Sequence, residues 1–114
     1  MKSFRVHTCQ PHSWGPIPYM VIEFLGLGMV TLDFSELEPG IDYPMAPVTL
    51  SALALYDLLQ GRSLAVSSDE ENVSFHPEGE ELVIVREASG KRPMNQYRVW
   101  ASEVSVAWNV FGWN

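Results

Sequence analysis

The sequence predicts an α+β domain: a strongly twisted antiparallel sheet, or small open barrel, of six to eight strands with one central helix packed on a face. Two observations lead to this fold class. Short segments alternate apolar and polar residues at period two along most of the chain, and one middle segment combines helix formers with start and stop signals. A β-sandwich with an inserted helix is the alternative. The 114 residues, 46 % of them hydrophobic, fit a single domain over residues 1–114.

Three strands are expected in the first third of the chain. Residues 2–8 alternate, and residues 19–25 and 29–34 flank Gly26-Leu27-Gly28, which suits a hairpin with a glycine turn. Residues 35–47 then contain three prolines and three acidic residues, a composition typical of a long acidic loop.

The helix is expected over Leu50–Gln60. Thr49 or Ser51 can cap its start, and Gly61 supplies a stop signal after about three turns. The leucines of this segment do not fall on one narrow stripe, so the helix is expected to be covered on more than one side.

Only strands are expected in the second half of the chain. The strongest alternation lies in Ser102–Phe111, where the larger apolar residues occupy every second position and predict a terminal strand with one buried face. That face would hold Val104, Val106, Trp108 and Val110. Shorter strands separated by turn residues are expected over residues 63–67, 73–76, 82–86 and 97–100.

The charge distribution favours a basic partner. The net charge is −7, and residues 19–61 contain six acidic residues and no basic one. Because nucleic-acid affinity depends on Lys and Arg neutralising phosphates, nucleic acid is not an expected partner. A basic protein is the expected one, and homo-oligomerisation is left open.

The expected setting is the cytoplasm. The chain begins without the apolar core of a secretory signal, and its longest apolar stretch, residues 19–32, is interrupted by Glu23 and two glycines, so no membrane insertion is expected. The single cysteine, Cys9, cannot form an internal disulfide, which is compatible with a reducing compartment.

A histidine and cysteine cluster suggests a metal site as a minor alternative. His7, Cys9 and His12 lie within six residues, and with His76 they would supply the nitrogen and sulfur ligands of a tetrahedral zinc site. The segment lacks the paired-cysteine spacing that makes zinc motifs specific, so no cofactor is predicted. Cys9 as a nucleophile beside either nearby histidine is a weaker hypothesis, because spacing suggests no third orienting residue.

Two sets of residues are candidates for a binding surface. The first set contains rings in irregular or terminal segments, where burial in the core is less assured than in a strand. These are Trp14, Tyr19, Tyr43 and Trp113. The second set contains the acidic residues of the proline-rich segment: Glu36, Glu38 and Asp42.

Two classes of function follow from these features. The first is a small acidic, non-enzymatic interaction protein of inhibitor, immunity-protein or adaptor type that masks a basic site on a partner. The second is a small-molecule or metal-binding domain with a pocket between helix and sheet, in which catalysis is an open question. The sequence favours the first class, with no catalytic residues assigned.

Overall fold

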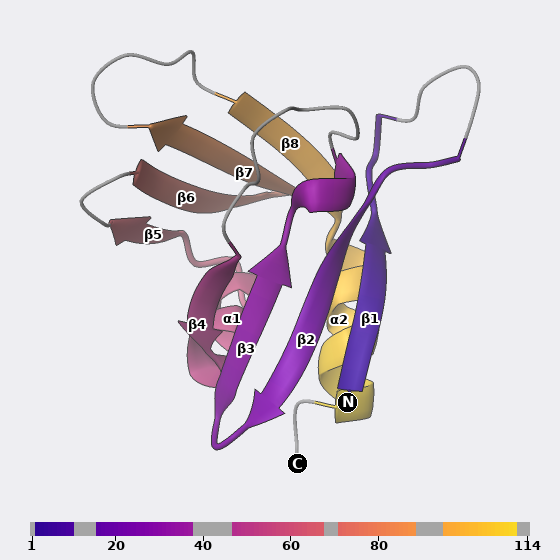
Figure 1. Cartoon of the computed structure of the whole chain (residues 1–114), viewed down its shortest axis with the longest axis vertical. Coiled ribbons are helices and arrows are strands. Elements are labelled where there is room, and N and C mark those ends of the chain that lie inside the picture. The colour runs from indigo at the N-terminus through magenta and orange to yellow at the C-terminus, as the bar shows by residue number, and fades with distance from the viewer. Residues whose placement is uncertain (1, 11–15, 38–46, 68–70, 89–94, 112–114) are drawn as a thin grey trace.

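The computed structural model describes residues 2–10, 16–37, 47–67, 71–88 and 95–111. These residues form two antiparallel sheets of four strands, two α-helices and a short 3-10 helix (Figure 1). Sheet A contains β1 (Lys2–His7), β2 (Tyr19–Gly26), β3 (Met29–Asp33) and β4 (Val48–Ser51). Sheet B contains β5 (Leu64–Ser67), β6 (Glu71–Glu78), β7 (Glu81–Ala88) and β8 (Asn95–Trp100). The helices are η1 (Ser35–Leu37), α1 (Ala52–Leu59) and α2 (Ala101–Phe111).

The α+β class is confirmed, whereas the single sheet or barrel and the one central helix are not. The two halves of the chain share one plan, because each forms a four-stranded meander whose last strand leads directly into an α-helix. Figure 1 shows α1 and α2 together behind sheet A, with sheet B extending away from it. No described helix is long and apolar enough to cross a membrane.

The two sheets meet where β1 ends beside β8. Thr8 forms an isolated antiparallel bridge with Val99. The Cys9 amide donates to the Arg98 carbonyl at 2.8 Å, and the Thr8 hydroxyl donates to the same carbonyl at 3.1 Å. We call this junction the seam. Because β1 is an outer strand of sheet A and β8 an outer strand of sheet B, the seam protects one edge of each sheet.

The β2–β3 hairpin forms at the predicted glycine turn. Buried and exposed positions alternate along both strands, with Met20, Ile22 and Phe24 facing inward from β2. The turn holds three consecutive residues at positive φ, namely Gly26 at 85°, Leu27 at 54° and Gly28 at 75°. Glycine adopts this conformation at little cost, so its placement on both sides of Leu27 explains why the chain reverses here.

Helix α1 begins two residues later than predicted. Ser51 is its N-cap, accepting a hydrogen bond from the Ala54 amide at 3.1 Å, and Gly61 follows its end at a φ of 89°. Leu50 instead belongs to β4, which sequence reasoning missed because this strand has only four residues and the last of them, Ser51, is the cap itself. The expected cover on several sides is wrong, since Leu53 is exposed.

The predicted terminal strand is wrong, because Ala101–Phe111 is the helix α2. Val104, Ala107 and Trp108 are buried and Phe111 packs against the core, a spacing of three and four residues that matches one helical face. The other two residues of the predicted face, Val106 and Val110, are 48 % and 56 % exposed. This segment fits the period of a strand along most of its length as well as the period of a helix. The packing of α2 against β1, β7 and α1 selects the helix.

The core lies between the inner faces of both sheets and the two helices. Phe34, the residue that follows β3, stacks on Tyr97 of β8, with ring centroids 6.3 Å apart. Arg86 enters this core from β7 with its guanidinium 4.9 Å from the Phe34 ring centre, and it pairs with Glu71 of β6. The largest fully buried side chains come from both sheets and both helices: Phe34, Phe75, Met20, Ile22, Leu32, Leu55, Ile84, Val6, Val30, Val99 and Val104.

Candidate binding surfaces

The outer face of sheet A carries one of the predicted binding residues, Tyr19. It is formed by the side chains that alternate with the core positions: Ser3, Arg5, His7, Tyr19, Val21, Glu23, Thr31, Asp33 and Thr49. All of these are partly or fully accessible. The face therefore combines one aromatic ring with charges of both signs.

Tyr19 and Glu36 lie at the same end of this face. Val21 pairs with Asp33 across β2 and β3, so Tyr19, two residues before Val21, is a diagonal neighbour of Asp33. Asp33 caps the following turn by accepting a hydrogen bond from the Ser35 amide at 2.9 Å, and η1, which contains the exposed Glu36, packs against β2. The structure thus brings Asp33, which sequence reasoning did not single out, into the same region.

The Tyr19 ring is held by two neighbours from β1. The Arg5 guanidinium lies 4.6 Å from the ring centre, and the His7 ring meets it edge-on at a centroid distance of 6.1 Å. These contacts hold a half-buried ring at the surface, where it remains available to a partner.

Several predicted residues lie outside the described part of the chain. They are Trp14, Glu38, Asp42, Tyr43 and Trp113 of the binding set and His12 of the metal set. Their roles stay predictions.

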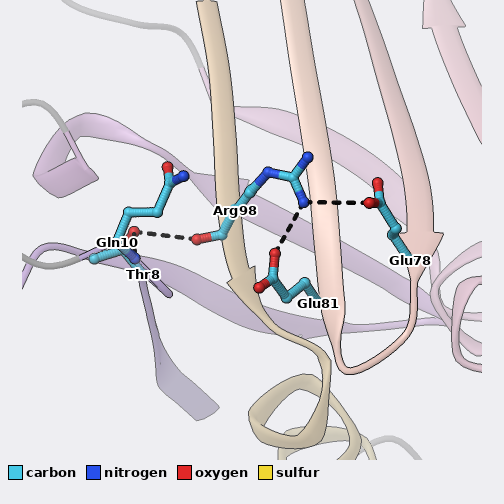
Figure 2. Close-up of polar contacts among 5 residues, drawn as sticks. All are labelled: Thr8, Gln10, Glu78, Glu81 and Arg98. Carbon is cyan, nitrogen blue, oxygen red and sulfur yellow. Dashed lines mark hydrogen bonds and ion pairs between the residues drawn. The ribbon is translucent and has the colours of Figure 1, made fainter.

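Arg98 is the polar centre of the seam, on the outer face of sheet B (Figure 2). Its guanidinium is 2.9 Å from the Glu81 carboxylate and 3.6 Å from that of Glu78, while its carbonyl accepts from Thr8. The Gln10 amide in turn donates to the Thr8 hydroxyl at 3.1 Å. These contacts fix the position of the chain just before residues 11–15.

His7 and Cys9 lie close to the seam, and His7 is paired there with a carboxylate. His7 Nδ1 is 2.7 Å from a carboxylate oxygen of Glu103, the acidic residue in the first turn of α2. No group of three or more His, Cys, Asp or Glu side chains among the described residues is arranged to hold a metal ion. His76 lies on β6, separated from β1 by β7 and β8, and its ring contacts Ser63 instead.

The surroundings of the Cys9 thiol disfavour its ionisation. Partial burial raises its pKa to about 11, the carboxylates of Glu81 and Glu103 act in the same direction, and Arg98 only partly offsets them. A catalytic cysteine needs a lowered pKa to be a thiolate near neutrality. Cys9 is therefore a protonated thiol at neutral pH.

We expect Cys9 to be alkylated about tenfold more slowly than an ordinary cysteine at pH 8. A pKa of about 11 instead of 9.0 lowers the thiolate population about a hundredfold, and the higher nucleophilicity of that thiolate recovers roughly a factor of ten. Iodoacetamide rates between pH 7 and pH 10 measure this, with the urea-unfolded chain as control. Equal alkylation rates in folded and unfolded protein would contradict the raised pKa.

The raised pKa of Cys9 also adds stability to the folded state. This stability is complete below about pH 9 and is lost as the pH rises to about 11.

Ser63 and His76 form a second polar pair that the sequence did not suggest. The Ser63 hydroxyl is 2.7 Å from His76 Nδ1 on the outer face of sheet B, and both residues are exposed. A nucleophile and base of this kind also need a third group that orients the histidine. None of the hydrogen bonds between described residues supplies a carboxylate to His76, so the pair has the features of a surface contact.

A groove of about 510 Å³ lies between the end of α1, the β6–β7 turn and the start of α2. Its walls include Leu58, Pro77 and Trp100, and Glu80, Ser102 and Ser105 add polar groups. The Ala101 amide donates to the Glu80 carbonyl at 3.0 Å, which fixes the β6–β7 turn against the first residue of α2. The size lies within the range of small-molecule sites in proteins.

The tip of the β2–β3 hairpin is an exposed apolar surface. Leu27 is fully exposed, at 103 %, and Leu25, Met29 and Leu53 are also exposed. Leu53 belongs to this surface because α1 begins beside the turn, where the Ala52 amide donates to the Gly28 carbonyl at 2.7 Å. We call these four residues the tip surface. A hollow of about 40 Å³ adjoins them, lined in part by Gly26, Gly28, Met29, Ala52 and Phe111.

Leu27 stabilises nothing within the chain. A leucine at positive φ costs about 1–2 kcal/mol, and full exposure means that no packing compensates for it. We expect Leu27→Asn to leave the free energy of unfolding unchanged or to raise it by up to about 1 kcal/mol, because asparagine tolerates this conformation. Urea denaturation measures the change, and Leu32→Ala, at a fully buried position, is the contrast with an expected loss of about 2–5 kcal/mol. A clear loss of stability in Leu27→Asn would mean that Leu27 makes stabilising contacts within the chain, which its full exposure contradicts.

Comparisons of this chain with models of protein families, with curated proteins and with solved structures find no match. The functional argument therefore depends on the surfaces described above.

Proposed function

We propose that this chain is a non-enzymatic binding protein whose outer face of sheet A contacts a basic site on a partner protein. The observation that supports it most is the convergence of Tyr19, Asp33 and Glu36 at one end of an accessible sheet face. Aromatic side chains concentrate binding energy at interfaces, and carboxylates around them accelerate encounter with a basic surface. The predicted residues Glu38, Asp42 and Tyr43 follow η1 in the chain and belong to the same proposal.

The ion pairs also support a net negative surface. Among the described residues, Glu71, Glu78, Glu81, Glu103 and Asp57 pair with basic side chains. The ion pairs between described residues do not include Glu23, Asp33 or Glu36, whereas Arg5 is the one arginine on that face and stacks on Tyr19. This surface thus keeps an excess of carboxylates for an external partner.

The chemistry of the nucleophiles supports a role without catalysis. Cys9 is held as a thiol, and the Ser63–His76 pair lies exposed without a described orienting carboxylate. Neither arrangement supplies the activated group that acyl transfer or hydrolysis needs.

Charge-neutral variants test the proposal once a partner has been isolated. Capture from a lysate of the native cell at low salt, followed by a salt gradient, should yield a basic protein at one-to-one stoichiometry. Replacing Glu36, Glu38 and Asp42 together by Gln should slow association with that protein and flatten its salt dependence. We expect Glu38 and Asp42 to face solvent as Glu36 does, so the free energy of unfolding should change by less than about 1 kcal/mol.

The matched control removes three carboxylates from the other sheet. Glu78, Glu80 and Glu87 are exposed on sheet B or its turn, so their joint replacement by Gln changes net charge equally at a different place. The control should retain most of the association rate. Equal rates for both triple variants and the unaltered chain at every ionic strength would reject Glu36, Glu38 and Asp42 as part of the interface, and with them the acidic end of the proposed surface.

A second candidate function is the binding of a small ligand in the groove beside α2. Its volume of about 510 Å³ and its mixture of apolar walls with hydroxyl groups favour this alternative. Native mass spectrometry with metal analysis separates the two functions. A stoichiometric non-protein mass that Ser105→Trp removes would support the groove, and an unliganded chain would favour the interaction protein.

A further inference from the structure

We infer that the tip surface is a self-association interface, in which two copies of this chain meet about a two-fold axis. The occupant of each hollow is then the Leu27 side chain of the other copy. The inference rests on the tip alone and does not depend on the proposed basic partner.

A projecting side chain and a matching hollow lie next to each other on the tip. Leu27 projects fully into solvent between Gly26 and Gly28, and both glycines line the hollow. Its volume of about 40 Å³ has room for roughly three groups of the size of a water molecule, so the methyl end of one leucine side chain is enough to fill it. A surface that carries both a projection and its complement is self-complementary, as two-fold interfaces require.

The charges on the tip favour a second copy over a basic protein. The chain has a net charge of −7, so two copies repel each other over most of their surfaces. Neither the tip surface nor the residues that line the hollow include a carboxylate, and Lys2 is the one charged residue among them. Two copies can therefore meet here without bringing carboxylates of these residues together, whereas a basic partner would find none of them to contact.

The backbone at Leu27 gives the interface a rigid anchor. Ala52 of α1 holds the turn through its hydrogen bond to Gly28, and the Phe24 ring behind the hollow packs on Phe111 at a centroid distance of 5.6 Å. A leucine held in position by such a turn loses little freedom on binding. Apolar exposed patches of this kind are typical of interaction sites.

Sedimentation velocity of the full chain tests the inference. We expect a monomer–dimer equilibrium in the micromolar range for the unaltered chain. Leu27→Asn should raise the dissociation constant about thirtyfold, as expected for an anchor residue at the centre of an interface. Ile17→Asn is the control, because Ile17 is an exposed apolar residue of 51 % that belongs to neither the tip surface nor the hollow, and it should leave the equilibrium unchanged.

A complementation experiment tests the insertion itself. Ala52→Leu places a larger side chain in the hollow while leaving Leu27 in place, and it should also weaken self-association. A mixture of Leu27→Asn with Ala52→Leu restores one insertion of the two, so a heterodimer should form more strongly than either variant dimer. Circular dichroism confirms that both variants are folded.

Four outcomes would overturn the inference: a monomeric unaltered chain through the micromolar range, a dimer that persists in Leu27→Asn, a loss of the dimer in Ile17→Asn, or no heterodimer in the mixture.

The dependence on salt concentration separates this inference from the proposed function. Raising ionic strength should preserve or strengthen the dimer by screening repulsion between acidic chains, whereas it should weaken binding of a basic partner.

Discussion

Replacing Trp108 with Ala should lower the free energy of unfolding by about 3–5 kcal/mol. Trp108 is only 6 % exposed, and its ring lies 5.5 Å from that of Tyr56, so it joins α2 to α1 as well as to the core. Its removal deletes a large apolar surface and leaves a cavity that rigid neighbours fill only in part. Urea denaturation with linear extrapolation measures the loss.

Val106→Ala is the matched control for Trp108→Ala. Val106 lies on the same helix but is 48 % exposed, so its truncation should change stability by less than about 0.5 kcal/mol. In a strand, Val106 and Trp108 would share one face and both variants would be costly. Comparable losses in the two variants would therefore favour a strand and contradict α2.

The contrast between the two ends of the chain shows what local pattern can decide. The β2–β3 hairpin was predictable because it leaves two independent signals in the sequence. Period-two alternation marks its two antiparallel strands, and its turn places glycines at positive φ. At Ala101–Phe111, alternating valines produce period two, while Val104, Ala107 and Trp108 also satisfy the helical period. Only the contacts of α2 with distant strands decide between them, and sequence periodicity does not contain those contacts.

The division into two sheets was not predictable for a related reason. The four shorter strands predicted over residues 63–100 match β5 to β8, but the placement of their sheet beside sheet A depends on the seam, where Thr8 meets Val99, 91 positions later in the sequence. A single bridge of this kind leaves no pattern in composition or spacing. The short β4 was missed because it has only four residues and its last one, Ser51, is also the cap of α1.

The sequence could predict which types of residue belong to the candidate surfaces, but not which of these residues lie together in the fold. Ring and charge counts selected Tyr19 and Glu36, and the structure adds Asp33 through strand register. The exposed Leu27 had a sequence signal, an apolar residue between two turn glycines, which was interpreted as a turn and not as a contact. The Ser63–His76 contact had none, since register alone places these residues opposite each other.

The second large effect is expected at the buried ion pair of sheet B. Arg86 is 5 % exposed and lies against the Phe34 ring, and its Nε donates to the Glu71 carboxylate at 3.1 Å. Glu71→Gln keeps the shape of this side chain but removes its charge, so a guanidinium remains in the core with less compensation. Breaking a buried pair from one side costs about 3–5 kcal/mol, and we expect a loss at the lower end, about 3 kcal/mol, because the Glu71 side chain is 25 % exposed and glutamine still accepts one hydrogen bond.

Two further variants establish that the loss in Glu71→Gln comes from charge in the core. Glu81→Gln removes the partner of Arg98 at the accessible seam, where the side chains are 26 % and 32 % exposed, and should cost less than about 1 kcal/mol. The double variant Glu71→Leu with Arg86→Leu removes both charges and should be more stable than Glu71→Gln, because no guanidinium then remains in the core without the Glu71 charge. Urea denaturation of the four proteins gives the comparison. If the double variant is the least stable, the pair stabilises this fold through its own attraction, and the cost assigned to an uncompensated arginine is wrong.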